Sequence, residues 1–460
     1  MTDRVDADYL VVGAGASGMA FADAIVEHSA SRVALVDRRH GVGGHWLEDY
    51  PFVRLHQAST FYGVASTVLG GGRQTSGPEA GLHERAGQAT ICSYYADVLE
   101  HRLLDSGRVE FFAGCDYVGD RTFVSRVSGR HFEVPPSCRV VDARYLSPEI
   151  PAESAPRFEV HGARVIAVND LSRLTEPPGA YVVVGSGKTA TDACVWLLRH
   201  GVDPDAICWV RPRDPWMLNR AVVQPDPEIY LGMVAEMMRL AGSATSLDAL
   251  FLGLEEAGIM LRLDRSVTPT MAKAPTLGAW ELEALRSIEH VVRLGHIRSA
   301  GQGRLDLTQG SVAIADDAIV VNCAADGLKR PPLVPIWQPG AITLQPVRAG
   351  FPCFGAALTG YVEATRASAA DEVKNRICAP SSFGNSLTDW ARMNVLGTRN
   401  VGSFSAEPDV KEWSDRVALN VARIPPGHPG SAALDRAVGD LQRYAGPGVQ
   451  RLEELARDAG

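Results

Sequence analysis

The chain has 460 residues, and its 45 Lys and Arg against 54 Asp and Glu give a formal net charge of −9. Hydrophobic residues make up 46% and charged residues 22%, which is the balance of a folded globular protein and excludes a disordered one. The chain is acidic and has no run of basic residues that would bind the phosphates of a nucleic acid. No stretch approaches the ~20 apolar residues that span a membrane, and the N-terminus lacks the apolar core of a signal peptide, so we expect a cytoplasmic protein.

The eight cysteines are scattered along the chain, and no two of them have the C-x-x-C spacing. That spacing is typical of zinc sites and of redox-active dithiols. We therefore expect no metal and no dithiol, and we expect most of the cysteines to be small buried hydrophobic side chains.

The chain opens with the pattern of a strand, a glycine-rich turn, a helix and a second strand. Gly13, Gly15 and Gly18 fit the G-x-G-x-x-G fingerprint of dinucleotide binding. In that fingerprint the glycines permit a tight turn, a close approach of the backbone to a pyrophosphate, and close packing of the helix on the strand. The second strand ends in Asp37, where a carboxylate can bind ribose hydroxyls, so we expect an adenine dinucleotide here.

A second unit of the same kind follows an amphipathic helix at about 93–104 and short strands at 109–160. Its turn, Gly185-Ser-Gly-Lys-Thr-Ala190, fits G-x-G-x-x-A between a strand and a helix. The next strand ends in Arg211 and Arg213 instead of an acidic residue. Arginine can bind a 2′-phosphate through charge-assisted hydrogen bonds, so the pattern favours NADPH over NADH. The alternative is that Arg211 and Arg213 are solvated loop residues that bind no cofactor.

The pattern becomes helical from about 227 to 294, and a tail broken by Pro and Gly ends in a helix. We predict a mixed α/β fold with two Rossmann-like domains, the second inserted into the first. The first domain comprises 1–165 and 317–460, including a C-terminal cap, and the second comprises 166–316 with the helical insert. The insert is either a lid over the substrate or a subunit interface.

The segment that begins at Asp37 continues to Gly43-Gly44-His45-Trp46 and resembles the acidic residue followed by G-G-x-W in class B flavin-dependent monooxygenases. In that family the first dinucleotide fold binds FAD and the second binds NADPH, so the resemblance implies both cofactors. Residues 319–327 resemble the strand through which such chains return to the FAD domain, and 359–362 lie where the chain closes over the flavin. The family fingerprint F-x-G-x-x-x-H is absent. This departure indicates a divergent bacterial branch, similar to amino-acid N-oxygenases such as those that convert aspartate to nitrosuccinate.

The resemblance implies an enzyme that reduces FAD with NADPH, activates O₂ as a flavin C4a-hydroperoxide and oxygenates the nitrogen of a small primary amine. An anionic amino acid such as aspartate is the expected substrate. The expected partners are therefore a small molecule and O₂, with no nucleic acid and no membrane, and a homodimer is compatible with the sequence. Two alternatives stay open. One is a Baeyer–Villiger or S-oxygenating monooxygenase with a neutral substrate, and the other is a flavin-binding protein without turnover or an NADPH oxidase.

The segment after Trp46 lines the flavin ring in the family, and here it carries Arg54 and His56. Residues at i and i+2 face the same side of an extended chain. Arginine can hold a carboxylate bidentately and histidine titrates near neutral pH. We therefore expect Arg54 to bind the substrate's carboxylate and His56 to bind it or to take the amine proton, unless both bind the backbone or the FAD pyrophosphate. Tyr62 is expected beside the substrate, and Gln57 at the flavin edge with a catalytic role.

The residues expected to bind the cofactors lie in the two glycine turns, in the G-G-x-W segment, and at the ends of the strands that follow the turns. The helix N-termini after both turns favour the negative charge of a pyrophosphate. These residues are Gly13, Gly15, Ser17, Gly18, Asp37, Arg38, Gly44, His45, Trp46, Gln57, Gly185, Ser186, Gly187, Lys188, Thr189, Arg211 and Arg213.

Overall fold

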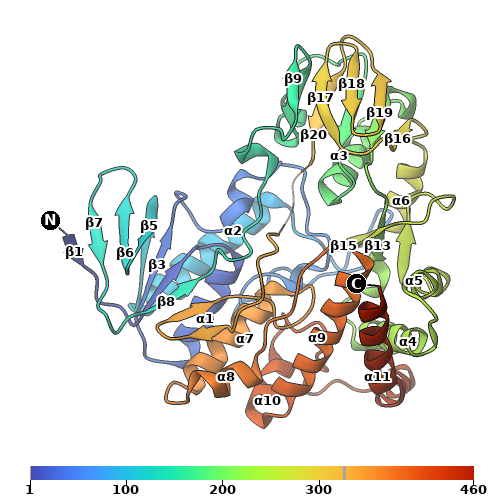
Figure 1. Cartoon of the computed structure of the whole chain (residues 1–460). Coiled ribbons are helices and arrows are strands. Elements are labelled where there is room, and N and C mark those ends of the chain that lie inside the picture. The colour runs from blue at the N-terminus through green and yellow to red at the C-terminus, as the bar shows by residue number, and fades with distance from the viewer. Residues whose placement is uncertain (1, 325–327, 460) are drawn as a thin grey trace.

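The structure is a computed structural model that describes residues 2–324 and 328–459. Figure 1 shows an upper part built from the middle of the chain and a lower part built mainly from its two ends, with another piece of the middle beside the C-terminal helix. Each part contains a largely parallel sheet, which confirms the prediction of two Rossmann-like domains, one inserted into the other. The expected return segment at 319–327 includes residues 325–327, which lie outside the described residues.

The six-stranded sheet of the first domain combines strands from both sides of the insertion. Its order is β21 (Trp337–Gln338), β22 (Ala341–Thr343), β8 (Arg139–Asp142), β2 (Tyr9–Val12), β3 (Val33–Asp37) and β4 (Val109–Ala113), and only the β21–β22 pair is antiparallel. β2 and β3 are buried along their whole length, since both faces of the sheet are covered.

One face of this sheet packs on α1 (Ala16–His28) and α7 (Pro352–Thr365), which lie side by side. The other face packs on a small sheet made of β1 (Thr2–Arg4), β7 (His131–Glu133), β6 (Thr122–Ser125) and β5 (Cys115–Gly119). Gly360 of α7 is required by this packing, because a Cβ there would lie 2.8 Å from the Ala24 Cβ of α1. Residues 359–362 therefore serve the contact between two helices, where we expect a segment that closes over the flavin.

The sheet of the second domain is five-stranded and entirely parallel. Its order is β10 (Arg164–Ala167), β20 (Ile319–Asn322), β11 (Tyr181–Val184), β12 (Ile207–Val210) and β16 (Val291–Val292). α3 (Lys188–Arg199) connects β11 to β12. Beside it lies a second sheet of β19 (Gly310–Ala313), β18 (Arg304–Leu307), β17 (Ile297–Gly301) and β9 (Glu159–His161).

The expected domain boundaries at 166 and 316 are therefore too narrow. β20 is buried along its whole length between β10 and β11, and β9 pairs with β17, so both strands belong to the second domain. These strands find their partners far away in the sequence, which a local pattern does not reveal.

The middle of the chain adds a smaller unit of helices and strands. Its helices are α4 (Pro227–Ser243), α5 (Leu247–Glu256) and α6 (Ala279–Arg286), and its sheet has the order β14 (Met260–Arg262), β13 (Pro215–Asn219) and β15 (Met271–Leu277). The region of helical pattern from 227 to 294 also contains the strands β14 and β15. Both strands pair with β13, which precedes the region of helical pattern.

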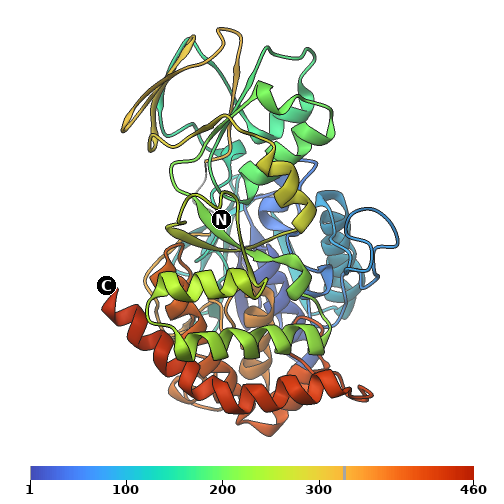
Figure 2. The ribbon, with the colours of Figure 1, turned by 90° about the vertical axis from the view of Figure 1, so that its right-hand side faces the viewer.

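The C-terminal part of the chain is helical and covers this unit. It contains α8 (Asp371–Ile377), α9 (Leu387–Ser405), α10 (Pro408–Arg416) and α11 (Ala432–Asp458). α11 packs along α4 (Figure 2), and Met238, Phe251, Trp390 and Leu452 share one buried core. Among the described residues, no helix is both long and apolar enough to cross a membrane.

Two features near the first domain complete the architecture. α2 (Gln88–Val98) continues into a π-helical turn at Leu99–Leu103, so the predicted helix at 93–104 begins earlier than expected. All eight cysteines are free thiols, and only Cys92 is not fully buried, as expected for small hydrophobic side chains.

Candidate active site

The first glycine turn lies between β2 and α1 and leaves the N-terminus of that helix open. Gly15 is the N-cap residue and no side chain caps the helix, so its first N–H groups can bind an anion. Gly13 has a φ of +106°, and a Cβ on Gly18 would lie 1.9 Å from the Gly13 carbonyl oxygen. Only glycine fits either position. Ser17 is half-buried in the first turn of the helix, so the turn has the form that a pyrophosphate requires.

The G-G-x-W segment lies against this turn. A Cβ on Gly44 would be 3.0 Å from the Gly15 Cα, so the two backbones approach closely. Gly44 begins the 3₁₀ helix η1 (Gly44–Glu48), and the buried Trp46 on it donates a hydrogen bond from Nε1 to the Tyr62 hydroxyl at 2.6 Å. The structure thus brings Gly44, Trp46 and Tyr62 to the first glycine turn.

Asp37 braces the same turn from the end of β3. Its buried carboxylate accepts hydrogen bonds from the Ala14 N–H at 2.7 Å and from the Arg39 N–H at 2.8 Å. A carboxylate has about four acceptor sites, so two stay available for ribose hydroxyls. Arg38 is turned toward Glu153, with which it forms an ion pair at 3.0 Å.

His45 and Asp49 form a pair at the other side of η1, with His45 Nε2 3.7 Å from Asp49 Oδ2. Burial and then the charge of Arg39 lower the pKa of His45 to about 4. Burial raises the pKa of Asp49 to about 7, although the charge of Lys188 acts in the opposite direction. Neutral His45 therefore faces a carboxyl group that gains its charge near neutral pH.

The second glycine turn repeats the geometry of the first. Gly185 has a φ of +129°, and Gly187 caps α3 without a side chain, so this helix N-terminus is also open to an anion. Ser186 and Thr189 are half-buried beside it. Lys188 is held by Asp192, which also accepts a hydrogen bond from the hydroxyl of Tyr50, a first-domain residue, at 2.8 Å. This contact ties α3 to the first domain.

Arg211 and Arg213 have different surroundings. Arg211 is 3% exposed, pairs with Asp214 at 3.1 Å and lies over the Trp209 ring at 4.6 Å. Arg213 is exposed and has no ion pair or hydrogen bond within the described part of the chain. Of the two, Arg213 is the one that can meet a 2′-phosphate without giving up a partner.

An open cavity of about 450 Å³ lies where the first domain, α3 and α6 meet, and we call it the junction cavity. Arg54 reaches it from the first domain, but His56 does not line it. The structure therefore does not bring Arg54 and His56 together at this cavity, and the chain bends at 56–57. Gln57 is buried next to the bend.

His56 is instead held against β15 and the end of β13. Its carbonyl accepts hydrogen bonds from Arg220 Nε at 3.0 Å and from the Thr276 hydroxyl, and its ring Nδ1 accepts one from the Thr276 N–H at 3.4 Å. Burial and then the charges of Lys188, Arg220 and Arg85 lower the pKa of His56 to about 3. A ring with so low a pKa can accept a hydrogen bond but is a weak base at neutral pH.

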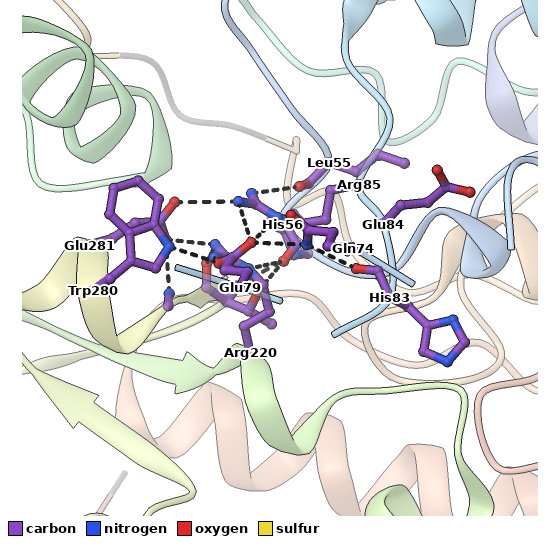
Figure 3. Close-up of polar contacts among 12 residues, drawn as sticks. Leu55, His56, Gln74, Glu79, His83, Glu84, Arg85, Arg220, Trp280 and Glu281 are labelled. Atoms are coloured by element: carbon purple, nitrogen blue, oxygen red, sulfur yellow. Dashed lines mark hydrogen bonds and ion pairs between the residues drawn. The ribbon is translucent and has the colours of Figure 1, made fainter. Parts of the chain in front are cut away.

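A buried cluster of two arginines and two glutamates, which we call the charge cluster, adjoins the junction cavity, and its members Arg85 and Glu281 line the cavity. Figure 3 shows the polar contacts of this cluster. Arg220 is 2% exposed and pairs with Glu79 and, at 2.7 Å, with Glu281. Arg85 pairs with Glu79 at 2.9 Å and with Glu281 at 3.6 Å. Burial alone would raise the pKa of Glu79, but the charges of Arg220 and Arg85 lower it to about 2. The sequence pattern gives no sign of this cluster, because its members are widely separated along the chain.

Two open glycine turns, each between a parallel strand and a helix, define a protein with two dinucleotide-binding folds. Residues 11–58 match the NAD(P)-binding Rossmann-like domain. The chain is 38% identical over 458 residues to uncharacterised proteins of Mycobacterium bovis and of two strains of Mycobacterium tuberculosis. The match covers 98% of this chain and 84% of each relative, and the chain belongs to the family of these mycobacterial proteins.

The chain is also similar to solved structures of low sequence identity. One is cyclohexanone monooxygenase from Rhodococcus sp. Phi1 bound to NADP+, at 13% identity and a TM-score of 0.49, covering 96% of this chain and 97% of that chain. Another is a flavin-containing monooxygenase from Stenotrophomonas maltophilia, at 13% identity and a TM-score of 0.41, covering 80% and 99%. A third is a bacillithiol disulfide reductase from Staphylococcus aureus, at 10% identity and a TM-score of 0.43, covering 80% and 100%.

Proposed function

We propose that the protein is an FAD- and NADPH-dependent monooxygenase that oxygenates the nitrogen of a small anionic amine, of which aspartate is a simple example. The observation that carries the proposal is the pair of open glycine turns in two parallel-sheet domains of one chain. Such turns hold dinucleotide pyrophosphates. FAD is assigned to the first turn, beside Gly44 and Trp46, and NADPH to the second, within reach of Arg213.

The overall reaction combines the amine, O₂, NADPH and a proton to give a hydroxylamine, NADP⁺ and water. One oxygen atom enters the N–H bond and the other leaves as water, and NADPH provides the two electrons. When bound, the flavin supplies the activation of oxygen, while the protein supplies binding and orientation. Arg54 would bind the substrate's carboxylate in the junction cavity. His56 has a pKa of about 3, so it would not take the amine proton. Its ring would instead accept a hydrogen bond, as it does from the Thr276 N–H.

The test starts from purified protein loaded with FAD and supplied with NADPH, air and an anionic amine. We expect NADPH oxidation in proportion to N-oxygenated product, with little hydrogen peroxide. Stoichiometric peroxide that does not depend on the amine would identify an oxidase instead. Oxygenation of a neutral ketone or sulfide, but not of the amine, would contradict the substrate class. Bound flavin without NADPH oxidation would identify a flavin-binding protein, and failure to bind flavin would refute the proposal as a whole.

A further inference from the structure

The junction cavity carries positive charge that the protein does not neutralise. Its two acidic residues are already paired: Asp192 binds Lys188 and the Tyr50 hydroxyl, and Glu281 belongs to the charge cluster. Arg54 and Arg199 also line the cavity, and both are exposed. Neither has a carboxylate partner among the residues that the structure describes. An anion in the cavity would provide one, through charge-assisted hydrogen bonds.

Aromatic side chains form part of the cavity wall. Phe52 of the first domain stacks on Trp196 of α3, with ring centroids 4.9 Å apart and an angle of 24° between the planes. The His200 ring also lies against Trp196, with ring centroids 4.0 Å apart. Trp280 of α6 forms a further wall, and the Arg199 guanidinium lies 5.6 Å from the centre of its ring. Such half-buried rings favour a flat apolar ligand through stacking and burial of apolar surface.

The charge cluster fixes these groups in place. Arg85 donates a hydrogen bond to the Leu55 carbonyl at 3.1 Å, and Arg220 donates one to the carbonyl of the next residue, so the backbone beside Arg54 is held from behind. Glu79 accepts a hydrogen bond from Trp280 Nε1 at 3.1 Å (Figure 3). The cavity is therefore organised before any ligand binds, which reduces the entropic cost of binding.

We propose that the junction cavity binds an aromatic carboxylate, with Arg54 and Arg199 on the carboxylate and the ring of Trp280 against the aromatic body. The cavity volume of about 450 Å³ lies in the range of small-molecule sites. As a statement about the substrate, this inference rests on the proposed function and narrows the anionic amine to one with a flat apolar ring. An aliphatic acid such as aspartate would satisfy the arginines but leave the aromatic walls uncovered.

Calorimetric titration of the FAD-loaded protein with four probes tests this inference. 2-Aminobenzoate and benzoate carry both the ring and the carboxylate, aspartate lacks the ring, and aniline lacks the carboxylate. We expect the two aryl carboxylates to bind at least about tenfold more tightly than aspartate or aniline, since only they combine a charge-assisted contact with a buried ring. Aspartate binding as tightly as benzoate, or no binding of benzoate, would overturn the inference.

Variants locate the binding. Arg54→Gln and Arg199→Gln should each raise the Kd of benzoate about tenfold. Arg298→Gln, at an exposed arginine of β17, is the matched control and should leave the Kd unchanged. Trp280→Leu should weaken benzoate more than aspartate. Unchanged Kd values in both cavity arginine variants, or competition between benzoate and NADP⁺, would show that the anion binds elsewhere. These outcomes do not depend on turnover, so the loss of binding and the loss of oxygenation are separate results.

Discussion

Replacing His56 by Gln should make the protein less sensitive to acid. Burial and the charges of Lys188, Arg220 and Arg85 lower the pKa of His56 from the ordinary 6.5 to about 3. Below pH 6.5 His56 therefore binds a proton in the unfolded chain, whereas in the folded chain it binds one only below about pH 3. Above pH 6.5 the ionisation of His56 does not affect stability. Between pH 6.5 and about pH 3 the free energy of unfolding falls as the pH decreases.

The size of the effect follows from the width of the window. Each pH unit within it removes about 1.4 kcal/mol, so acidification from pH 6.5 to 4.5 costs about 2.7 kcal/mol through His56. That is a substantial part of the ~5–15 kcal/mol by which native proteins are stable. Glutamine retains an acceptor for the Thr276 N–H, which His56 Nδ1 binds at 3.4 Å, and it cannot take a proton. His45 has a low pKa as well, but it is present in both proteins and does not affect the comparison.

Urea denaturation at pH 7 and at pH 4.5 measures the effect. The parent, His56→Gln and His101→Gln are compared, and the last is the control because the His101 side chain is 73% exposed. We expect the parent and the control to lose about 2.7 kcal/mol more than His56→Gln between the two pH values. An equal loss of unfolding free energy in all three proteins would refute a buried His56 beside cationic groups. His56 would then be a candidate for the base that takes the amine proton.

Asp49→Asn should raise the free energy of unfolding increasingly from about pH 4 to pH 7, because burial raises the pKa of Asp49 to about 7 and ionisation places a charge in a buried site. Urea denaturation at pH 5 and pH 8 measures this gain, which should be the larger at pH 8. Arg220→Met should lower the free energy of unfolding by about 3–5 kcal/mol, since it leaves two buried carboxylates with one arginine. The exposed Arg298→Gln should change stability little, and an equal effect of both would contradict a buried cluster. Arg213→Gln should raise the KM for NADPH about tenfold and leave the KM for NADH unchanged. Steady-state kinetics with both cofactors measure this difference, whereas Arg211→Gln should mainly lower stability.

The two glycine turns could be predicted from the sequence because all their determinants are local. The strand, the turn, the helix and the next strand follow one another within about 30 residues, as the fingerprint requires. Gly18 illustrates this, since the contact that forbids a side chain is with Gly13, five positions earlier in the same turn. The fold class follows from the repetition of this unit.

The junction cavity and the charge cluster could not be predicted in the same way. Glu79, Arg220 and Glu281 lie on three different segments, and only the tertiary fold brings them together. Arg54 lines the junction cavity whereas His56 does not, because His56 is held by hydrogen bonds from Arg220 and Thr276, which lie far away in the sequence. Arg211 and Arg213 differ for the same reason, since only Arg211 has an acidic partner nearby.

The packing of α11 along α4 has a consequence for the order in which the chain can fold. α4 (Pro227–Ser243) is synthesised long before α11 (Ala432–Asp458), yet Met238 and Leu452 belong to one core. During synthesis the face of α4 that packs on α11 therefore stays exposed to solvent until most of the remaining chain has left the ribosome. Contacts between such distant segments form slowly because a long loop has to close first. Until α11 docks, chaperones can bind this exposed face of α4, and the face can also take part in aggregation.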